Sequence, residues 1–567
     1  MEKTVPVETT AEAYIELLAA RGVDYFFGNG GTDFGPIVDA YAKRLASELP
    51  VPKPITVPHE ITAVSMAHGY TMITGRPQVV MVHTIAGTAN SIGSLINASR
   101  VQIPMLFSAG RTPTTEGQTH LRGARNGGIH WAQESFDQGS MVREWVKWDY
   151  ELRPGVDLEG VVDRALAITQ SAPRGPVYLT LPREVLSEER ESLTYSDRPR
   201  MTPNETVASP ESVRQAAEAL VKAKNPIVLA KSLGKEPEAV PALVRLAEAL
   251  SLPVYDGGAT HMNFPTTHPL HQTGPSKVTE ADVILVTEND VPWMPVNTEP
   301  RKDATVIQLG NDPLFQRYPL RTFAAHVSLA GAPALTLAAL TNAVLALKPD
   351  ARVVAERRAM YAEAHDKARE ATRQRGEEAR STRPMSKSWV AYCLSRLIAE
   401  DTVIVNELGL DTSQFSFTRP GTLFGPPMSG VLGWGLGASL GAKLASPNQT
   451  VVSCLGDGSY MFGVPSAGHW VSRRFNLPVL WLVWNNAKWN AVAGATRGVF
   501  PDGWAVKTNS FPFSDLSPSL DFELICQSAG GYGERVEDPD DVPGALERAL
   551  HAVQVEKRQA LLNLVSQ

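Results

Sequence analysis

The sequence predicts an α/β protein built from three doubly wound parallel-sheet domains. Short runs rich in β-branched and aromatic residues alternate with helix-period segments along most of the 567 residues. Such alternation is typical of parallel sheets that helices cover on both faces. A domain of about 150 residues is common, so the length also suggests about three to four domains. The predicted strands are 79–82, 105–108, 177–181, 227–230, 283–287, 306–309, 451–455 and 479–484.

Two polar stretches divide the chain. Residues 188–209 contain Pro199 and Pro203 and are predicted to be a linker. Residues 351–386 are crowded with Arg, Glu and Lys, which predicts an exposed helix with i,i+4 ion pairs and then a loop around Pro384. The predicted domains are therefore 1–190, 205–348 and 385–567, and the central one could bind a nucleotide or coenzyme A.

Composition narrows the class of protein. A net charge of −7 argues against a general nucleic-acid binder, which would be basic. Residues 327–347 are uncharged, but Pro333 and several Thr residues favour a soluble helix over a membrane span. The three cysteines lie far apart, and the N-terminus lacks a signal-peptide pattern. We therefore expect a cytoplasmic enzyme with a small-molecule substrate and neither nucleic acid nor membrane as a partner.

The most informative motif begins with Gly456-Asp457-Gly458-Ser459, which follows a predicted buried strand. Asn485-Asn486 follows the next predicted strand, and 26 residues (459–484) separate Gly458 from Asn485. Ligands bind beyond the carboxyl ends of parallel strands, so Asp457 and Asn486 should lie together there. Their oxygens suit Mg²⁺ or Ca²⁺, and glycines before a helix suit phosphate. The motif predicts a metal–diphosphate site, although each half alone could be an ordinary turn.

This pair of motifs resembles the cofactor signature of the thiamine-diphosphate (ThDP) enzymes of the acetolactate synthase and benzoylformate decarboxylase superfamily. The resemblance implies ThDP and Mg²⁺ as cofactors. The metal would be held by Asp457, the Asn486 side chain and the Lys488 carbonyl. Gly456, Gly458 and Ser459 would lie at the diphosphate.

Two further segments are similar to the same superfamily. Residues 426–445, PPMSGVLGWGLGASLGAKLA, resemble the segment that binds the thiamine rings. Leu432 would be the apolar wedge that bends ThDP, and the Gly430 carbonyl would accept a hydrogen bond from its amino group. Residues 58–97 resemble the pyrimidine-binding domain, and Glu60 matches its activating glutamate. Because Glu60 and Asp457 lie on different domains, the resemblance implies a homodimer or homotetramer with active sites between subunits.

Five residues are predicted to face the substrate. His83 stands where the benzoylformate decarboxylase branch has a proton-transferring histidine, and Thr32 where it has a serine. Histidine suits proton transfer near neutral pH, but His83 could equally be a hydrogen-bonded core residue. Gln133 could donate a hydrogen bond to a substrate oxygen. Val492 and Ala493 are the candidates to lie over the cofactor, and Ala493 either leaves room or replaces a functional group.

The resemblance leaves the reaction open. The favoured hypothesis is a carbon–carbon lyase that cleaves a 2-hydroxyacyl-CoA to formyl-CoA and an aldehyde or ketone. Loop arginines such as Arg111, Arg122 and Arg125 could bind the phosphates of this acyl-CoA. The alternatives are a 2-oxo acid decarboxylase of the benzoylformate decarboxylase type and an acetolactate-synthase-like carboligase. An inactive regulatory or assembly homologue is a further alternative, against which the intact Glu60, Asp457 and Asn486 argue.

Overall fold

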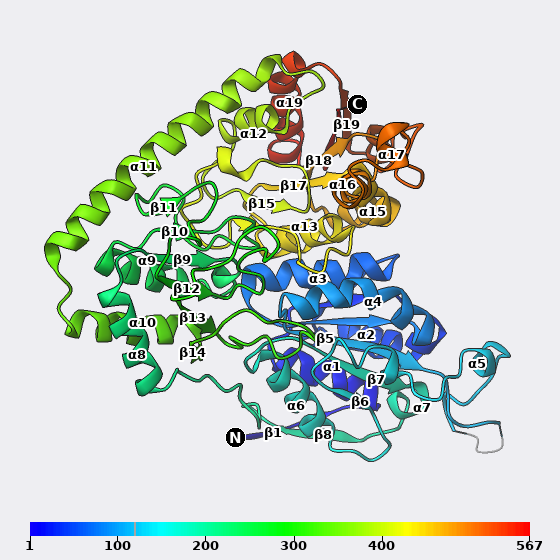
Figure 1. Ribbon diagram of the computed structural model, residues 1–567. Helices are drawn as coiled ribbons and strands as arrows, with labels where there is room; N and C mark the ends of the chain where they lie inside the picture. Colours follow the sequence, from blue (N-terminus) through cyan, green and yellow to red (C-terminus); the bar gives the residue numbers. More distant parts are fainter. Residues whose placement is uncertain (118–120, 567) are drawn as a thin grey trace.

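Three six-stranded sheets, in each of which the paired strands run parallel, confirm the predicted fold class. The computed structural model describes residues 1–117 and 121–566. In Figure 1 the first domain is blue to cyan, the central domain is green, and the third runs from yellow to red. All eight strands predicted from the sequence are present.

The first sheet has the order β3-β2-β4-β5-β7-β6, and most of its central strands are buried along their whole length. Its strands are β2 (Tyr25–Gly28), β3 (Lys53–Thr56), β4 (Gln78–Val82), β5 (Met105–Arg111), β6 (Asp149–Glu151) and β7 (Pro176–Pro182). The helices of this domain are α1 (Thr10–Ala20), α2 (Gly35–Ala46), α3 (Glu60–Thr74), α4 (Thr84–Arg100), α5 (Ile129–Ala132), α6 (Leu158–Gln170) and α7 (Arg183–Leu186).

The central sheet has the order β11-β10-β9-β12-β13-β14. Its strands are β9 (Pro226–Ala230), β10 (Val254–Tyr255), β11 (His271–Gln272), β12 (Val283–Thr287), β13 (Thr305–Gly310) and β14 (Val327–Ala330), with helices α8 (Pro210–Lys222), α9 (Ala239–Leu250) and α10 (Pro333–Ala346). The segment 327–347, predicted as one soluble helix, is thus a strand followed by a helix. No helix in the described part of the chain is long and apolar enough to cross a membrane.

The third sheet has the order β16-β15-β17-β18-β20-β19. Its strands are β15 (Val403–Asn406), β16 (Leu423–Phe424), β17 (Val451–Gly456), β18 (Leu480–Asn485), β19 (Tyr532–Val536) and β20 (Ala560–Val565). Its helices are α12 (Lys387–Ser395), α13 (Trp434–Ala445), α14 (Asp457–Phe462), α15 (Pro465–Phe475), α16 (Asn490–Val499), α17 (Trp504–Lys507), α18 (Phe522–Ser528) and α19 (Val542–Gln554).

The stretch 188–209 is not wholly a linker. Its first part forms β8 (Ser192–Ser196), which pairs antiparallel with β1 (Glu2–Pro6). Leu193 and Tyr195 alternate along this strand and are both buried, so the chain gains apolar contacts by ordering there. The pattern is only five residues long, which is why the surrounding prolines and charges obscured it.

The predicted exposed helix is confirmed as α11 (Ala351–Glu378). Its ion pairs at i,i+4 include Lys367 with Glu363 and Arg373 with Glu377. Figure 1 shows α11 as one long rod that runs along the edge of the molecule from the central domain to the third.

The first and third domains meet through α3 and α13, which lie against each other in Figure 1. Small residues let the two backbones approach closely. A Cβ atom on Gly69 would lie 2.0 Å from the Ala438 carbonyl oxygen, and one on Gly441 would lie 1.9 Å from that of Met66. This contact fixes how Glu60, at the start of α3, is held relative to the segment that precedes α13.

Candidate active site

The GDGS motif and the Asn pair lie at one edge of the third sheet. β17 and β18 are neighbours, with Gly456 paired to Trp484, and α14 begins at Asp457. Asp457 and Asn486 therefore leave adjacent strands at their carboxyl ends, as predicted. Burial raises the pKa of Asp457, and the backbone amides of Gly458 and Ala487 oppose that rise. The loop after β18 thus reaches the Asp457 carboxylate.

The donor groups at this edge fit a hard cation. Asp457 Oδ1 accepts a hydrogen bond from the Gly458 amide at 2.7 Å, whereas its buried Oδ2 finds no hydrogen-bond partner among the described residues. A buried carboxylate oxygen without a partner is costly, and a bound cation would remove that cost. Within the described residues no cluster of three His, Cys, Asp or Glu side chains could hold a metal. A site here would instead combine one carboxylate with the Asn486 amide oxygen and the Lys488 carbonyl.

Packing leaves no room for a side chain at Gly458, whereas there is room for one at Gly456. A Cβ atom on Gly458 would lie 2.2 Å from the Trp489 ring, whereas one on Gly456 would meet only Leu408 at 4.0 Å. Trp489, which the sequence analysis missed, therefore covers the first turn of α14. Ser459 is buried in the same turn.

The segment before α13 carries the other predicted cofactor residues. Gly430 is exposed in a turn with φ of +65°, and Leu432 is half-buried. Gly433 has φ of +81°, and a Cβ atom there would lie 2.5 Å from the Gly463 Cα atom. Beside this segment lies Glu407, which sequence reasoning missed. Burial raises the pKa of Glu407 to about 7, against hydrogen bonds from the amides of Gly435 and Gly433.

Glu60 is the first residue of α3 and is 7% exposed. Asn90 of α4 donates a hydrogen bond from Nδ2 to Glu60 Oε2 at 3.3 Å. His59 caps the helix, because its Nδ1 accepts a hydrogen bond from the Ile61 amide. One carboxyl oxygen of Glu60 thus has a donor on α4, and the residue sits at a fixed helix terminus.

His83 and Gln133 come together, and the structure adds a third residue, Asp33. His83 Nδ1 lies 2.6 Å from Asp33 Oδ1, and His83 Nε2 lies 3.3 Å from Gln133 Nε2. The Asp33 hydrogen bond is the main cause that raises the pKa of His83, and the charge of Glu60 adds to it. A Cβ atom on Gly31 would lie 2.2 Å from His83 Nδ1, so glycine leaves the space for this ring.

The remaining predicted substrate residues differ in access. Thr32 is exposed at the start of a short 3₁₀ turn (Thr32–Phe34) beside Asp33. On α16, Val492 is 45% exposed, whereas Ala493 is 3% exposed. Of these two neighbours, only Val492 presents an accessible side chain. The small Ala493 side chain packs inward.

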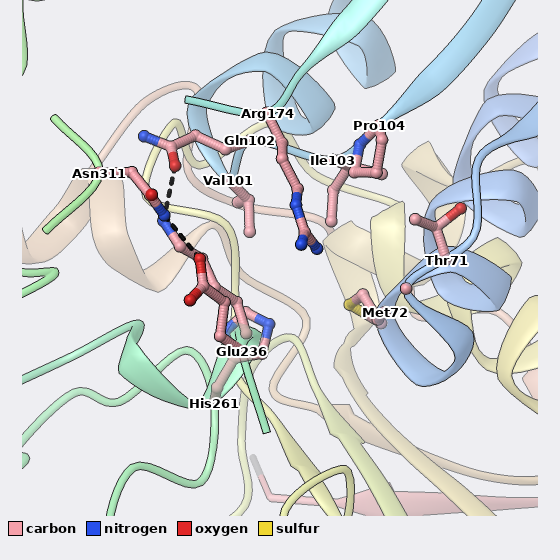
Figure 2. A pocket seen from close by; sticks show the side chains of 12 residues that line it. Thr71, Met72, Val101, Gln102, Ile103, Pro104, Arg174, Glu236, His261 and Asn311 are labelled. Atoms are coloured by element: carbon pink, nitrogen blue, oxygen red, sulfur yellow. Dashed lines mark hydrogen bonds between the residues drawn. The ribbon is translucent and has the colours of Figure 1, made fainter. Parts of the chain in front are cut away.

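Three of the arginines considered for coenzyme A form ion pairs. Arg111 and Arg125 both form ion pairs with Glu134, and Arg122 pairs with Glu189. Between the first and central domains, Figure 2 shows Glu236, His261 and Asn311 facing residues 101–104 across a pocket of about 30 Å³. That volume suits water and is too small for a nucleotide.

Family models match all three domains. The N-terminal TPP binding domain of thiamine pyrophosphate enzymes matches residues 8–141, the central domain matches 213–340, and the C-terminal TPP binding domain matches 408–563. The chain therefore belongs to the thiamine pyrophosphate enzymes of the acetolactate synthase and benzoylformate decarboxylase superfamily.

Individual relatives are similar over nearly the whole chain. Benzoylformate decarboxylase of Pseudomonas aeruginosa is 27% identical, over 96% of this chain and 97% of the relative. Acetolactate synthase of Bacillus subtilis is 24% identical, over 97% and 92%. Among solved structures, the ThDP-dependent 4-hydroxybenzoylformate decarboxylase of Rhodococcus jostii superposes with a TM-score of 0.78 at 23% identity, over 99% of both chains. This last similarity supports the fold.

Proposed function

We propose that the protein is a 2-oxo acid decarboxylase of the benzoylformate decarboxylase type, with ThDP and Mg²⁺ as cofactors. The observation that carries the proposal is the contact of His83 with Asp33 and Gln133. The charge of Glu60 also raises the pKa of His83. The similarity to benzoylformate decarboxylase over nearly the whole chain supports the same assignment. The acyl-CoA lyase hypothesis is less well supported, because the relatives that align with nearly the whole chain include benzoylformate decarboxylase and acetolactate synthase, and because Glu134 already pairs with Arg111 and Arg125.

Each residue has a definite task in this proposal. When bound, ThDP supplies the nucleophilic carbon and takes up the electron pair that CO₂ leaves behind. Glu60 hydrogen-bonds the pyrimidine ring and so activates the cofactor. His83, whose pKa is raised by its hydrogen bond to Asp33, donates a proton near the substrate oxygen, and Gln133 orients that oxygen. Asp457, Asn486 and the Lys488 carbonyl hold the metal, and Leu432 supports the rings.

We also propose a homodimer or homotetramer with active sites between subunits. Large apolar side chains gather around α16 and α17 with high exposure, among them Val499, Phe500, Trp504 and Phe513. An exposed group of this kind marks an interaction surface. Light scattering after size exclusion should therefore give at least twice the 61.4 kDa chain mass. A monomer in the presence of ThDP and Mg²⁺ would contradict shared active sites.

The reaction is tested by offering the protein, with ThDP and Mg²⁺, benzoylformate and aliphatic 2-oxo acids beside short 2-hydroxyacyl-CoAs. We expect CO₂ and an aldehyde from a 2-oxo acid, with no formyl-CoA. Formyl-CoA as the main product would restore the lyase hypothesis, and acetolactate from pyruvate would establish the carboligase. A protein that binds ThDP and turns over none of these would support the inactive homologue.

Cofactor binding is tested by thermal unfolding. Ligand at about 100 times its Kd stabilises a native protein by about 2.7 kcal/mol, so ThDP with Mg²⁺ should raise the unfolding temperature by several degrees. Asp457→Ala should abolish this rise, because it removes the carboxylate that faces the cation. Asp540→Ala is a matched control, since Asp540 is an exposed carboxylate of the same domain that pairs with Arg380. An equal rise in the Asp457→Ala variant would contradict the proposed metal site.

A further inference from the structure

Glu407 is a buried carboxylate with no part in the proposed chemistry. It follows β15, and its backbone amide donates to the Cys454 carbonyl of β17 at 3.0 Å. Its side chain points to residues 429–435, which we call the cofactor segment because Gly430 and Leu432 belong to it. Glu407 Oε1 accepts the Gly433 amide, and Oε2 accepts the Gly435 amide, both at 2.7 Å.

This geometry fixes the C-terminal end of the cofactor segment. Gly433 is the N-cap of α13 and Gly435 lies in its first turn. Their amides have no partner within a helix, and a carboxylate both satisfies them and interacts favourably with the positive end of the helix dipole. Two short hydrogen bonds to one carboxylate also set the direction in which the segment enters the helix. Leu432 directly precedes Gly433, so its backbone position depends on these bonds.

The other end of the segment is held from a different domain. Asn97, which is 1% exposed on α4, donates from Nδ2 to the Val431 carbonyl at 2.8 Å. Its Oδ1 accepts the Ser429 hydroxyl at 2.6 Å. Leu432 and Gly430 therefore lie between two anchors, one just after β15 of the third domain and one on α4 of the first.

We infer that Glu407 and Asn97 are positioning residues that hold the cofactor segment in its ThDP-binding conformation before the cofactor arrives. The inference rests on the assignment of this segment to ThDP and adds two residues to it. A segment held in one conformation loses less conformational entropy when the ligand binds. Removing either anchor should therefore weaken the affinity for ThDP. Neither residue needs to touch substrate.

The test is the Kd of ThDP in the presence of Mg²⁺. It can be measured by quenching of tryptophan fluorescence, because Trp434 belongs to the cofactor segment and Trp489 lies against Gly458. Glu407→Gln keeps the shape but offers one oxygen, so one amide faces an NH₂ group and loses its partner. Asn97→Asp keeps the acceptor for Ser429 and loses the donor to Val431. We expect both variants to raise the Kd at least about fivefold, which is about 1 kcal/mol of lost binding.

Two comparisons separate positioning from general stability. Glu523→Gln alters another buried carboxylate of the same domain, which accepts a hydrogen bond from Asn563, and should leave the ThDP Kd unchanged. With saturating ThDP, the anchor variants should recover most of their kcat, because their defect lies in binding. Ser429→Ala removes one bond to Asn97 and should have a smaller effect than Asn97→Asp.

Three results would overturn the inference. One is a ThDP Kd that stays within about twofold of wild type in both anchor variants. Another is an equal rise in the Glu523→Gln control. If Glu407→Gln does not fold, an unchanged ThDP Kd in Asn97→Asp alone would overturn the inference. A wild-type protein that binds no ThDP would instead overturn the cofactor assignment, whereas the choice of substrate does not enter this experiment.

Discussion

Glu60→Gln should lower kcat by about 10²–10⁴-fold, the usual contribution of a positioned proton-transfer group. Glutamine has the same shape, so α3 and its contact with α13 should remain. It cannot exchange a proton with the pyrimidine ring, however, and the cofactor would stay in its unreactive form. The measurement is steady-state decarboxylation beside the ThDP Kd. We expect the loss to fall on kcat, with the Kd changed much less.

The structure supplies a graded comparison for this experiment. Asn90→Ala removes the amide that donates to Glu60 Oε2 but leaves the carboxyl in place. It should therefore cost far less kcat than Glu60→Gln. If Glu60→Gln retained near-wild-type kcat while binding ThDP normally, Glu60 would not be the activating group, and the assignment of residues 58–97 would need revision.

His83→Ala should also lower kcat by about 10²-fold or more, and Asp33→Asn should give a smaller loss with a shifted pH profile. The Asp33 hydrogen bond raises the pKa of His83, so the imidazolium persists to higher pH than usual. Removing the Asp33 charge lowers that pKa, and the alkaline limb of kcat/KM should move to lower pH. The shift should vanish in His83→Ala.

The Asp33–His83 pair also predicts how the stability of the protein changes with pH. A histidine whose pKa is raised in the folded state adds stability below its ordinary pKa, and that stability is lost as pH rises through the raised value. Asp33→Asn should therefore destabilise the protein at acidic pH more than at alkaline pH. Asp24→Asn is a matched control in the same domain, since Asp24 pairs with Arg76 at the surface. An unshifted kcat/KM profile in Asp33→Asn would mean that His83 does not supply the proton.

Some parts of the site could be predicted because they are local in sequence. Asp457 and Asn486 follow two strands whose apolar runs are unmistakable, and parallel neighbours end at the same edge of a sheet. Glu60 begins a helix within a long characteristic segment. The lyase hypothesis rested on the overall resemblance of the chain, including the segment after Asn486, and such a resemblance does not specify the substrate; the relatives that align with nearly the whole chain include benzoylformate decarboxylase and acetolactate synthase.

Asp33, Trp489 and Glu407 were missed for one common reason. Each contacts a residue that is distant in the chain. Asp33 and Glu407 form hydrogen bonds to such residues, and Trp489 packs where Gly458 has no side chain. Asp33 meets His83 fifty positions away, and Glu407 meets Gly433 after twenty-six. An isolated Asp after a glycine-rich loop, or an Asn-Glu pair after a strand, is common, so neither carries a signal until its partner is in place.

The sequence by itself determined the three parallel-sheet domains and the position of Asp457 and Asn486 after neighbouring strands, because strand periodicity and short-range spacing encode them, and the resemblance of its motifs indicated the ThDP family. Only the tertiary structure decided that Asp33 raises the pKa of His83, that Val492 rather than Ala493 is accessible, and that Glu407 and Asn97 both form hydrogen bonds to the cofactor segment. Hydrogen bonds between distant segments depend on how domains pack, and no local pattern of residues specifies them.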